Sequence, residues 1–415
     1  MDWLTPLALA LMVLMGLHLP KAFTCLYVLL ALLAWRTRFT SDVDPQLRRS
    51  CGCLLLFSLS YSLISLHFGL WHLEGRELLD LISMLILPVM CLWIGARAAQ
   101  KFSWRQMSFL WLAYGIGAIL YAMVVLVYGR IMAQGGHWFN LLELRRQSSI
   151  AMPWGIDPIM NVRSIEQNAA FAISWFAAGL VLIRRSVDRA LGLMLVLLGS
   201  SGLAVGLSFN GRLGFLVMLV SALPAGWFFS GGNVRRIASF LAWGVGASAG
   251  AVIASLMWGR GSLYPRILAR VYDERIDRFL GFLTHMVSTP WGGQAMKFVY
   301  VDHQKETLVS FNAAAGDLLH NVPFDVVVRV GLIPALLLLA TVLPLFWRSL
   351  ARLRLALLQS SSAGPALILG GCMASLAVQW LFQPLIYSDG LLFYLGFLLL
   401  GYLAVKLPTP SPSAL

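Results

Sequence analysis

Charged residues are scarce in this sequence. Asp, Glu, Lys and Arg make up 12% of its 415 residues, whereas 59% are hydrophobic and the mean hydropathy is +0.78. Soluble chains are typically about a quarter charged and about half apolar. So few charged groups cannot solvate the surface of a globule of this size. The composition therefore excludes a cytosolic enzyme and a disordered chain.

The signatures of common soluble active sites are missing as well. The sequence has no P-loop, no GxGxxG in a βαβ context and no GxSxG. The segments that we place outside the cytoplasm below hold neither HExxH nor an Asp-x-Asp pair, and their acidic residues are too scattered for a metal cage. We therefore expect no metal and no cofactor, and arginines have to neutralise any phosphate that the protein binds.

Cysteine is also rare, and its spacing carries no chemistry. The cysteines lie in or beside apolar runs, without CxxC or Cys/His zinc spacing, and we expect them to be core residues that form no disulfide. They are Cys25, Cys51, Cys53, Cys91 and Cys372.

Long apolar runs are what the sequence has instead. A helix that crosses a bilayer needs roughly 20 mostly apolar residues, and about twelve stretches approach that pattern. They predict an all-α, polytopic membrane protein with about twelve transmembrane helices. The stretches lie near 4–19, 22–35, 51–71, 78–96, 107–128, 167–183, 190–208, 213–230, 237–257, 325–346, 364–383 and 389–405.

The net charge of +13 has a topological explanation. Lys and Arg gather in every second connection between the runs, and short basic connections favour the cytoplasm. This alternation predicts that both termini are cytoplasmic, and it accounts for the basic excess without nucleic acid. The residues are Arg36, Arg38, Arg48 and Arg49, then Arg97, Lys101 and Arg105, then Arg184, Arg185 and Arg189, then Arg235 and Arg236, then Arg348, Arg352 and Arg354.

Two long connections lie on the opposite side, near 129–166 and 258–324. The second has about 65 residues, which is too long for a mere connector, so we expect it to be folded. The predicted organisation is therefore 1–257 with the first nine helices, 258–324 as a large outer loop, and 325–415 with the last three helices and a short cytoplasmic tail. In a bacterium with two membranes, the outer side is the periplasm.

Few polar residues on the outer side can carry chemistry. Arg212 lies between two runs with almost no loop around it. It is either a snorkelling interfacial residue or a ligand for a phosphate group, which the planar guanidinium suits. His320 ends the large loop. It is either a hydrogen-bonded interface residue or a general base, since imidazole titrates near neutrality.

The start of the large loop has the pattern of an amphipathic helix. Arg266, Arg270 and Arg278 recur at helical spacing, with apolar positions that include Leu268 and Phe279. This pattern predicts a helix that lies at the lipid headgroups.

Three ordered patterns lie between about 165 and 405. They are Ser208-Phe209-Asn210-Gly211-Arg212, then Arg275 with Phe279 and Pro290-Trp291-Gly292-Gly293, then His320-Asn321 with Gly331-Leu332-Ile333. Together they resemble the O-antigen ligases and their polymerase-like relatives, a family of polytopic bacterial membrane proteins. Asn210-Gly211 stands where that family usually has Ser before the first arginine, and Phe279 stands where Trp is usual. Arg278 is close enough to take the place of Arg275 in the second pattern.

The resemblance implies a GT-C-like, metal-independent, inverting glycosyltransferase in the inner membrane of a Gram-negative bacterium. Such enzymes transfer a glycan from undecaprenyl diphosphate to a sugar hydroxyl of lipid A–core oligosaccharide at the periplasmic surface. By this resemblance, Arg212 and Arg275 (or Arg278) bind the diphosphate and His320 is the general base. Asn321 then orients the histidine or the acceptor. Asp389 either holds one of these groups or caps a helix.

Other functions share much of this pattern. A polymerase adds repeat units to a lipid-linked glycan, and a protein-directed O-oligosaccharyltransferase glycosylates Ser or Thr. Both would use the same arginines and histidine. A transporter of lipid-linked sugars instead requires ionisable residues at mid-membrane depth, for which Asp80 and Arg329 are the candidates.

Overall fold

The fold is mostly helical. The computed structural model describes residues 4–17, 22–37, 44–70, 75–132, 170–185, 188–208, 213–230, 274–289, 291, 296–302, 306–315, 317–383, 386 and 390–406. Within them, five helices are long and apolar enough to cross a membrane, at Pro45–His67, Glu77–Lys101, Trp104–Val124, Leu332–Leu357 and Ser362–Phe382. The coarse prediction of a helical membrane protein is confirmed.

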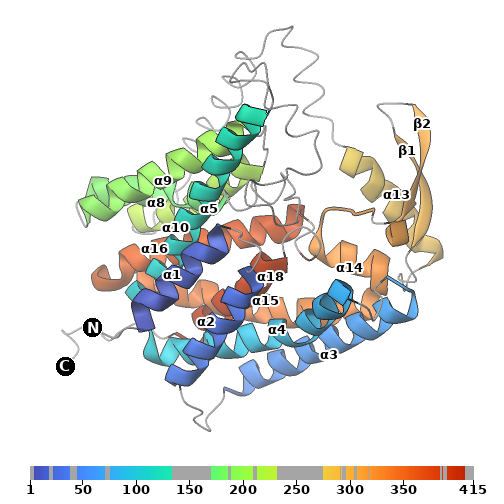
Figure 1. The fold of residues 1–415 in the computed structure, drawn as a ribbon, viewed down its shortest axis with the longest axis horizontal. Coiled ribbons are helices and arrows are strands. Elements are labelled where there is room, and N and C mark those ends of the chain that lie inside the picture. Colours follow the sequence, from blue (N-terminus) through green and yellow to red (C-terminus); the bar gives the residue numbers. More distant parts are fainter. Residues whose placement is uncertain are drawn as a thin grey trace, which may run out of the picture.

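In the described residues, the helices follow one another along the chain with one interruption by a β-hairpin (Figure 1). The described part of the chain is therefore not purely α. The elements are α1 (Leu4–Gly16), α2 (Ala22–Thr37), α3 (Pro45–His67), α4 (Gly75–Lys101), α5 (Trp104–Met132), α8 (Phe176–Arg185), α9 (Arg189–Ser208), α10 (Leu213–Ser230), α13 (Glu274–Ser288), β1 (Lys297–Asp302), β2 (Thr307–Asn312), η1 (Ala313–Ala315), α14 (Val322–Val330), α15 (Leu332–Leu357), α16 (Ser360–Phe382) and α18 (Gly390–Val405).

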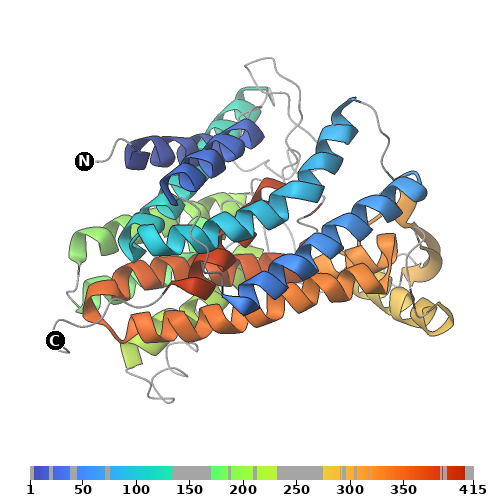
Figure 2. The same cartoon turned by 90° about the horizontal axis from the view of Figure 1, so that it is seen from below.

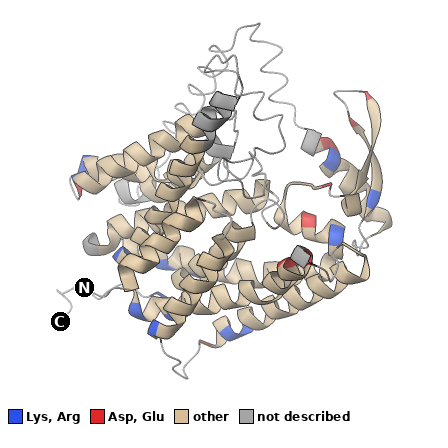
Figure 3. Cartoon of the chain, viewed as in Figure 1, with Lys and Arg blue, Asp and Glu red and all other residues tan. Residues whose placement is uncertain are grey.

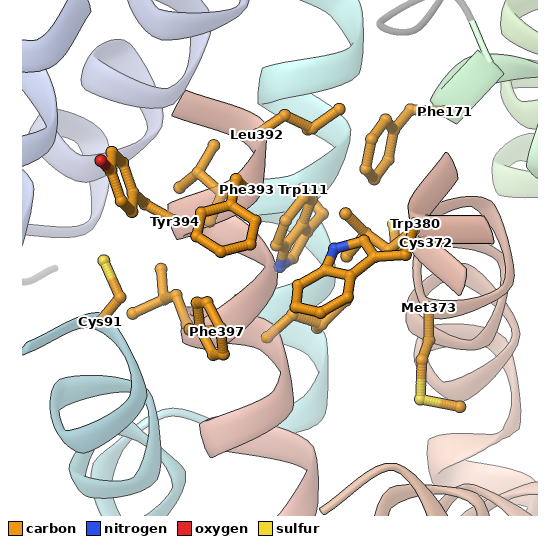
Figure 4. Packing of buried hydrophobic residues seen from close by; sticks show 14 of the residues in the cluster. Cys91, Trp111, Phe171, Cys372, Met373, Trp380, Leu392, Phe393, Tyr394 and Phe397 are labelled. Carbon is orange, nitrogen blue, oxygen red and sulfur yellow. The ribbon is translucent and has the colours of Figure 1, made fainter. Parts of the chain in front are cut away.

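Helix α18 forms the centre of the bundle. Every residue from Leu391 to Ala404 is buried, as expected for a helix that is apolar on all sides. Trp380 of α16 stacks on Phe393 with ring centroids 5.2 Å apart (Figure 4). On the other side α18 lies directly against α4, where a β-carbon at Gly95 or Gly401 would collide with the backbone of the facing helix. Small residues thus allow the two helices to approach closely.

The basic ends of several helices meet at one end of the bundle. The Arg36 guanidinium lies 5.3 Å from the Phe102 ring centroid, and Lys406 Nζ donates a 3.0 Å hydrogen bond to the Ala99 carbonyl. These contacts join the last turns of α2, α4 and α18. Figure 3 shows Lys and Arg concentrated toward the left end, with α13 and the hairpin on the right. This arrangement agrees with the alternation of basic connections in the sequence.

Helix α3 runs beside α15 and is fixed at the same basic end (Figure 2). The Asp44 carboxylate accepts a 2.9 Å hydrogen bond from the Gln46 amide, and Pro45 opens the helix, which is a common helix start. Asp44 also forms an ion pair with Arg348 of α15. The arginine holds the pKa of the Asp44 carboxyl below its usual value.

The described part of the predicted large loop is folded. β1 and β2 pair in antiparallel register, with Tyr300 opposite Val309, and Phe298 stacks on Phe311 at 4.5 Å. Helix α13 packs against β1, where His285 stacks on Phe298 at 5.7 Å. We call α13, β1 and β2 the loop unit.

The predicted span 325–346 is placed differently in the structure. α14 ends before Gly331, whose φ of 107° favours glycine, and α15 begins immediately after it. The nine-residue α14 is thus a separate helix, and the membrane-spanning candidate starts at Leu332. The predicted span 237–257, the loop from 133 to 166 and the first part of the large loop lie outside the described residues.

Candidate functional site

The structure describes the side chains of three predicted site residues, which are Arg278, His320 and Asn321. Arg275 belongs to α13, four residues before Phe279, and only its place in the helix is described. Arg212 and Asp389 lie outside the described residues.

His320 adopts an unusual backbone conformation. Its φ is 63°, in the left-handed region that costs a non-glycine residue about 1–3 kcal/mol. Such a residue persists only where its surroundings hold it, and it is a common feature of active sites. His320 is 7% exposed and directly precedes the Asn321 cap of α14. The predicted general base therefore lies in a tightly held turn.

Asp325 provides much of the hydrogen bonding that fixes this turn. It lies in the first turn of α14 and is 0% exposed. One carboxylate oxygen accepts a 2.6 Å hydrogen bond from the Leu319 amide, and the other accepts a 3.1 Å bond from the Asn321 amide. The two residues that flank His320 are thus bound to one buried carboxylate.

Opposing effects set the pKa of the Asp325 carboxyl. Burial raises the pKa of its carboxyl to about 7. The amides of Leu319, Asn321 and His320 and the positive charge of Arg329 act in the opposite direction, because each favours the carboxylate.

Asn321 fixes the start of α14 in two directions. Its Oδ1 accepts a 3.2 Å hydrogen bond from the Phe324 amide, which makes it the N-cap of α14. Its Nδ2 donates a 2.8 Å bond to the Leu381 carbonyl at the end of α16. Asn321 therefore positions the segment beside His320. A contact between Asn321 and a substrate stays a prediction.

Arg278 connects the loop unit to the same turn. Its Nε donates a 3.1 Å hydrogen bond to the Tyr300 hydroxyl, and an Nη donates a 3.4 Å bond to the Leu318 carbonyl. These two contacts give Arg278 a role in holding the site together. They favour Arg275 as the arginine that binds a diphosphate, although that assignment also stays a prediction.

The second and third sequence patterns come together in space. The Phe279 ring lies 5.1 Å from the Phe324 ring, and the Leu332 amide donates a 2.8 Å bond to the Trp291 carbonyl. The Met296 amide donates a 2.9 Å bond to the Val328 carbonyl. Helix α13, Trp291 and the His320-Asn321 turn therefore form one local structure at the start of α15.

Sequence reasoning missed the contribution of Asp325. An acidic residue in the first turn of a helix is a recognised signal. Its position after Asn321 matched that signal, but the sequence does not show that its carboxylate turns back to the residues before the helix. Tyr300 was missed because the hairpin that brings it to Arg278 was not predicted.

The fold and this site define a class. It is a helical membrane protein that carries the loop unit at one end of its helix bundle, beside a histidine in a hydrogen-bonded turn. No protein-family model matches the sequence, and no curated protein matches it. Among the described residues, no three His, Cys, Asp or Glu side chains lie close enough together to bind a metal ion.

Proposed function

We propose that this protein is an O-antigen ligase, which transfers O-antigen polysaccharide from undecaprenyl diphosphate to a sugar hydroxyl of lipid A–core. The observation that carries the proposal is the anchored turn of His320, which joins an arginine-bearing helix of the loop unit to the start of a membrane-spanning candidate. A general base beside an arginine helix, at the end of a membrane helix, suits a reaction between two lipid-linked glycans.

The proposed reaction needs few groups. His320 takes the proton from the acceptor hydroxyl as its oxygen attacks the anomeric carbon, a step typically worth about 10²–10⁴-fold in rate. The bond to the diphosphate breaks on the opposite face of the sugar, so the anomeric configuration inverts. Arg212 and Arg275 stabilise the negative charge that develops on the leaving undecaprenyl diphosphate. The activated donor supplies the energy, so the mechanism needs no metal, nucleotide or other cofactor.

The loop unit has a surface that suits a position at the membrane. α13 exposes an apolar row, Ile276, Leu280, Leu283 and Val287, on a single face. An amphipathic helix of this kind lies in the headgroup layer, where both reacting groups would meet while their lipid tails stay in hydrocarbon. In this proposal the membrane is the inner membrane of a Gram-negative bacterium, with the site on the periplasmic face and both termini in the cytoplasm.

The positions of the charged residues favour a glycosyltransferase over a transporter of lipid-linked sugars. Asp80 lies in the second turn of α4, and Arg329 lies in α14, before the membrane-spanning candidate begins. Neither residue is in the middle of a described span, where a transporter would need one. A polymerase or a protein-directed transferase would share the site, and only the acceptor distinguishes them.

An acceptor exchange with purified components tests the proposal. The protein in lipid nanodiscs is incubated with undecaprenyl-diphosphate-linked O-antigen and, in separate reactions, lipid A–core, a Ser/Thr-rich peptide or a lipid-linked repeat unit. We expect transfer to lipid A–core alone. Transfer to peptide or to the lipid-linked repeat would identify one of the alternatives, and no transfer to any acceptor would contradict all three.

A further inference from the structure

The buried carboxylate of Asp325 accepts hydrogen bonds from residues that precede its own helix, and these bonds are not needed to form the helix. We infer that Asp325 is a positioning residue that sets the direction of the His320 imidazole for proton transfer. This inference rests on the proposed function, because it assigns a partner to the proposed general base.

The first argument is the geometry of the turn. The Leu319 and Asn321 amides converge on the two oxygens of one carboxylate. Convergence of amides around an anion requires the intervening chain to curl, and it is commonly accompanied by a left-handed residue. His320 is that residue, with a φ of 63°. Because these bonds fix the backbone of the curled residue, the carboxylate sets the direction of the Cα–Cβ bond from which the imidazole extends.

The second argument is that two further contacts, from other helices, hold the ends of the turn. Arg278 binds the Leu318 carbonyl from α13, and Asn321 binds the Leu381 carbonyl of α16. These bonds fix where the turn lies in the molecule. The amides on both sides of His320 instead meet at Asp325, so a change there tilts the histidine while the turn stays attached.

The third argument is the environment of the carboxylate. Asp325 is fully buried, and Val322, Val326 and Val328 of its own helix are buried as well. Arg329, one helical turn further on, interacts electrostatically with it. A buried carboxylate that accepts two amide bonds is a rigid acceptor, because the packed surroundings leave it no alternative position.

Asp325→Asn is the variant that isolates this role. It preserves the shape of the side chain but replaces one acceptor oxygen with an NH2 group, which faces an amide that is itself a donor. We expect kcat for transfer to fall about 10²-fold, the scale typical of a displaced catalytic group, with the KM values for donor and acceptor unchanged within about twofold.

Asp317→Asn is the matched control. Asp317 lies in the same segment and accepts a 2.8 Å hydrogen bond from the Asn312 amide, but it does not bind the residues beside His320. We expect this variant to retain the wild-type kcat. If Asp325→Asn also retains it, the inference is wrong.

A double-mutant cycle separates positioning from general support of the fold. If Asp325 acts through His320, Asp325→Asn causes no further loss of the residual transfer rate in a His320→Ala background. An equal loss in both backgrounds would show that Asp325 only supports the fold, and it would overturn the inference. Should Asp325→Asn not fold, Asp325→Glu enters the same cycle, since it keeps both acceptors but displaces them by one methylene.

The same experiment distinguishes a failure of this inference from a failure of the proposed function. If the wild-type protein transfers no glycan, the function itself is wrong and the inference falls with it. If wild type and Asp317→Asn both transfer while Asp325→Asn matches them, only the role of Asp325 is wrong.

Discussion

The Phe279 ring packs edge-on against the Phe324 ring, with centroids 5.1 Å apart. Phe279 belongs to α13 and Phe324 to α14, so this contact joins the predicted arginine helix to the helix that begins beside His320. The distance between the helix that bears Arg275 and the turn of His320 therefore depends on a contact between two aromatic rings that take no part in the reaction.

Phe279→Ala tests that dependence. Loss of a large apolar side chain costs about 1.5–3 kcal/mol. We expect a lower melting temperature and a reduced transfer rate, whereas Phe279→Trp retains both. The control is Thr284→Ala, because Thr284 is exposed on the same helix and does not belong to its apolar row. Equal effects at the two positions would show that the ring contact does not matter.

The predicted site residues make a second test. Arg212→Ala, Arg275→Ala and His320→Ala should each reduce attachment of polymer to lipid A–core in cells below detection while the protein still inserts into the membrane, although a slow residual transfer by His320→Ala stays measurable with purified components. Insertion is checked by membrane fractionation, and attachment by electrophoresis of the lipopolysaccharide. If two of the three variants ligate normally, the assignment of the site is wrong.

Arg278→Ala should behave differently from Arg275→Ala. Arg278 donates hydrogen bonds to Tyr300 and Leu318, so its loss should lower the melting temperature and leave measurable transfer. The comparison uses initial rates of the two variants at equal protein amounts. Abolition by Arg278→Ala together with full activity of Arg275→Ala would move the diphosphate ligand to Arg278.

The protonation of Asp325 gives a pH-dependent stability. The pKa of its carboxyl is about 7 in the folded protein and about 3.9 in an unfolded chain, so between these pH values only the folded state binds the proton. The contribution of Asp325 to the free energy of unfolding therefore declines as pH rises from about 4 to 7, by up to about 4 kcal/mol, and then stays constant.

Melting curves across this pH range test whether the contribution of Asp325 to stability falls as pH rises. The melting temperature of wild type minus that of Asp325→Asn should fall from pH 4.5 to pH 7.5, because the variant lacks the titrating group. A difference that rises with pH, or stays constant, would contradict the raised pKa.

The exposed row of α13 predicts contact with lipid. A spin label at Leu280, in a cysteine-free background in proteoliposomes, should be accessible to oxygen more than to a water-soluble nickel reagent. A label at Ser288, a polar residue that is exposed on α13 to one side of this row, is the control and should show the reverse preference. Nickel accessibility at both positions would show that the helix lies in water.

The sequence was sufficient for the helical membrane class because apolar runs and basic connections act over whole segments. It also predicted His320 and Asn321 as site residues, and the structure places the two in one turn. The apolar run at 325–346 did not show the break at Gly331, because a glycine within such a run does not reveal its own φ. Phe279 was expected to face the headgroups but packs on Phe324, since helical periodicity does not show which apolar face a partner covers.

Stereochemistry and metal dependence of the transfer reaction test the central claim most directly. Wild-type protein, donor and lipid A–core are incubated with and without EDTA, and the new glycosidic linkage is assigned by NMR. We predict that the anomeric configuration of the transferred sugar inverts and that EDTA leaves the rate unchanged. Retention of configuration, or loss of activity that a divalent metal restores, would contradict an arginine-assisted transfer with His320 as the base.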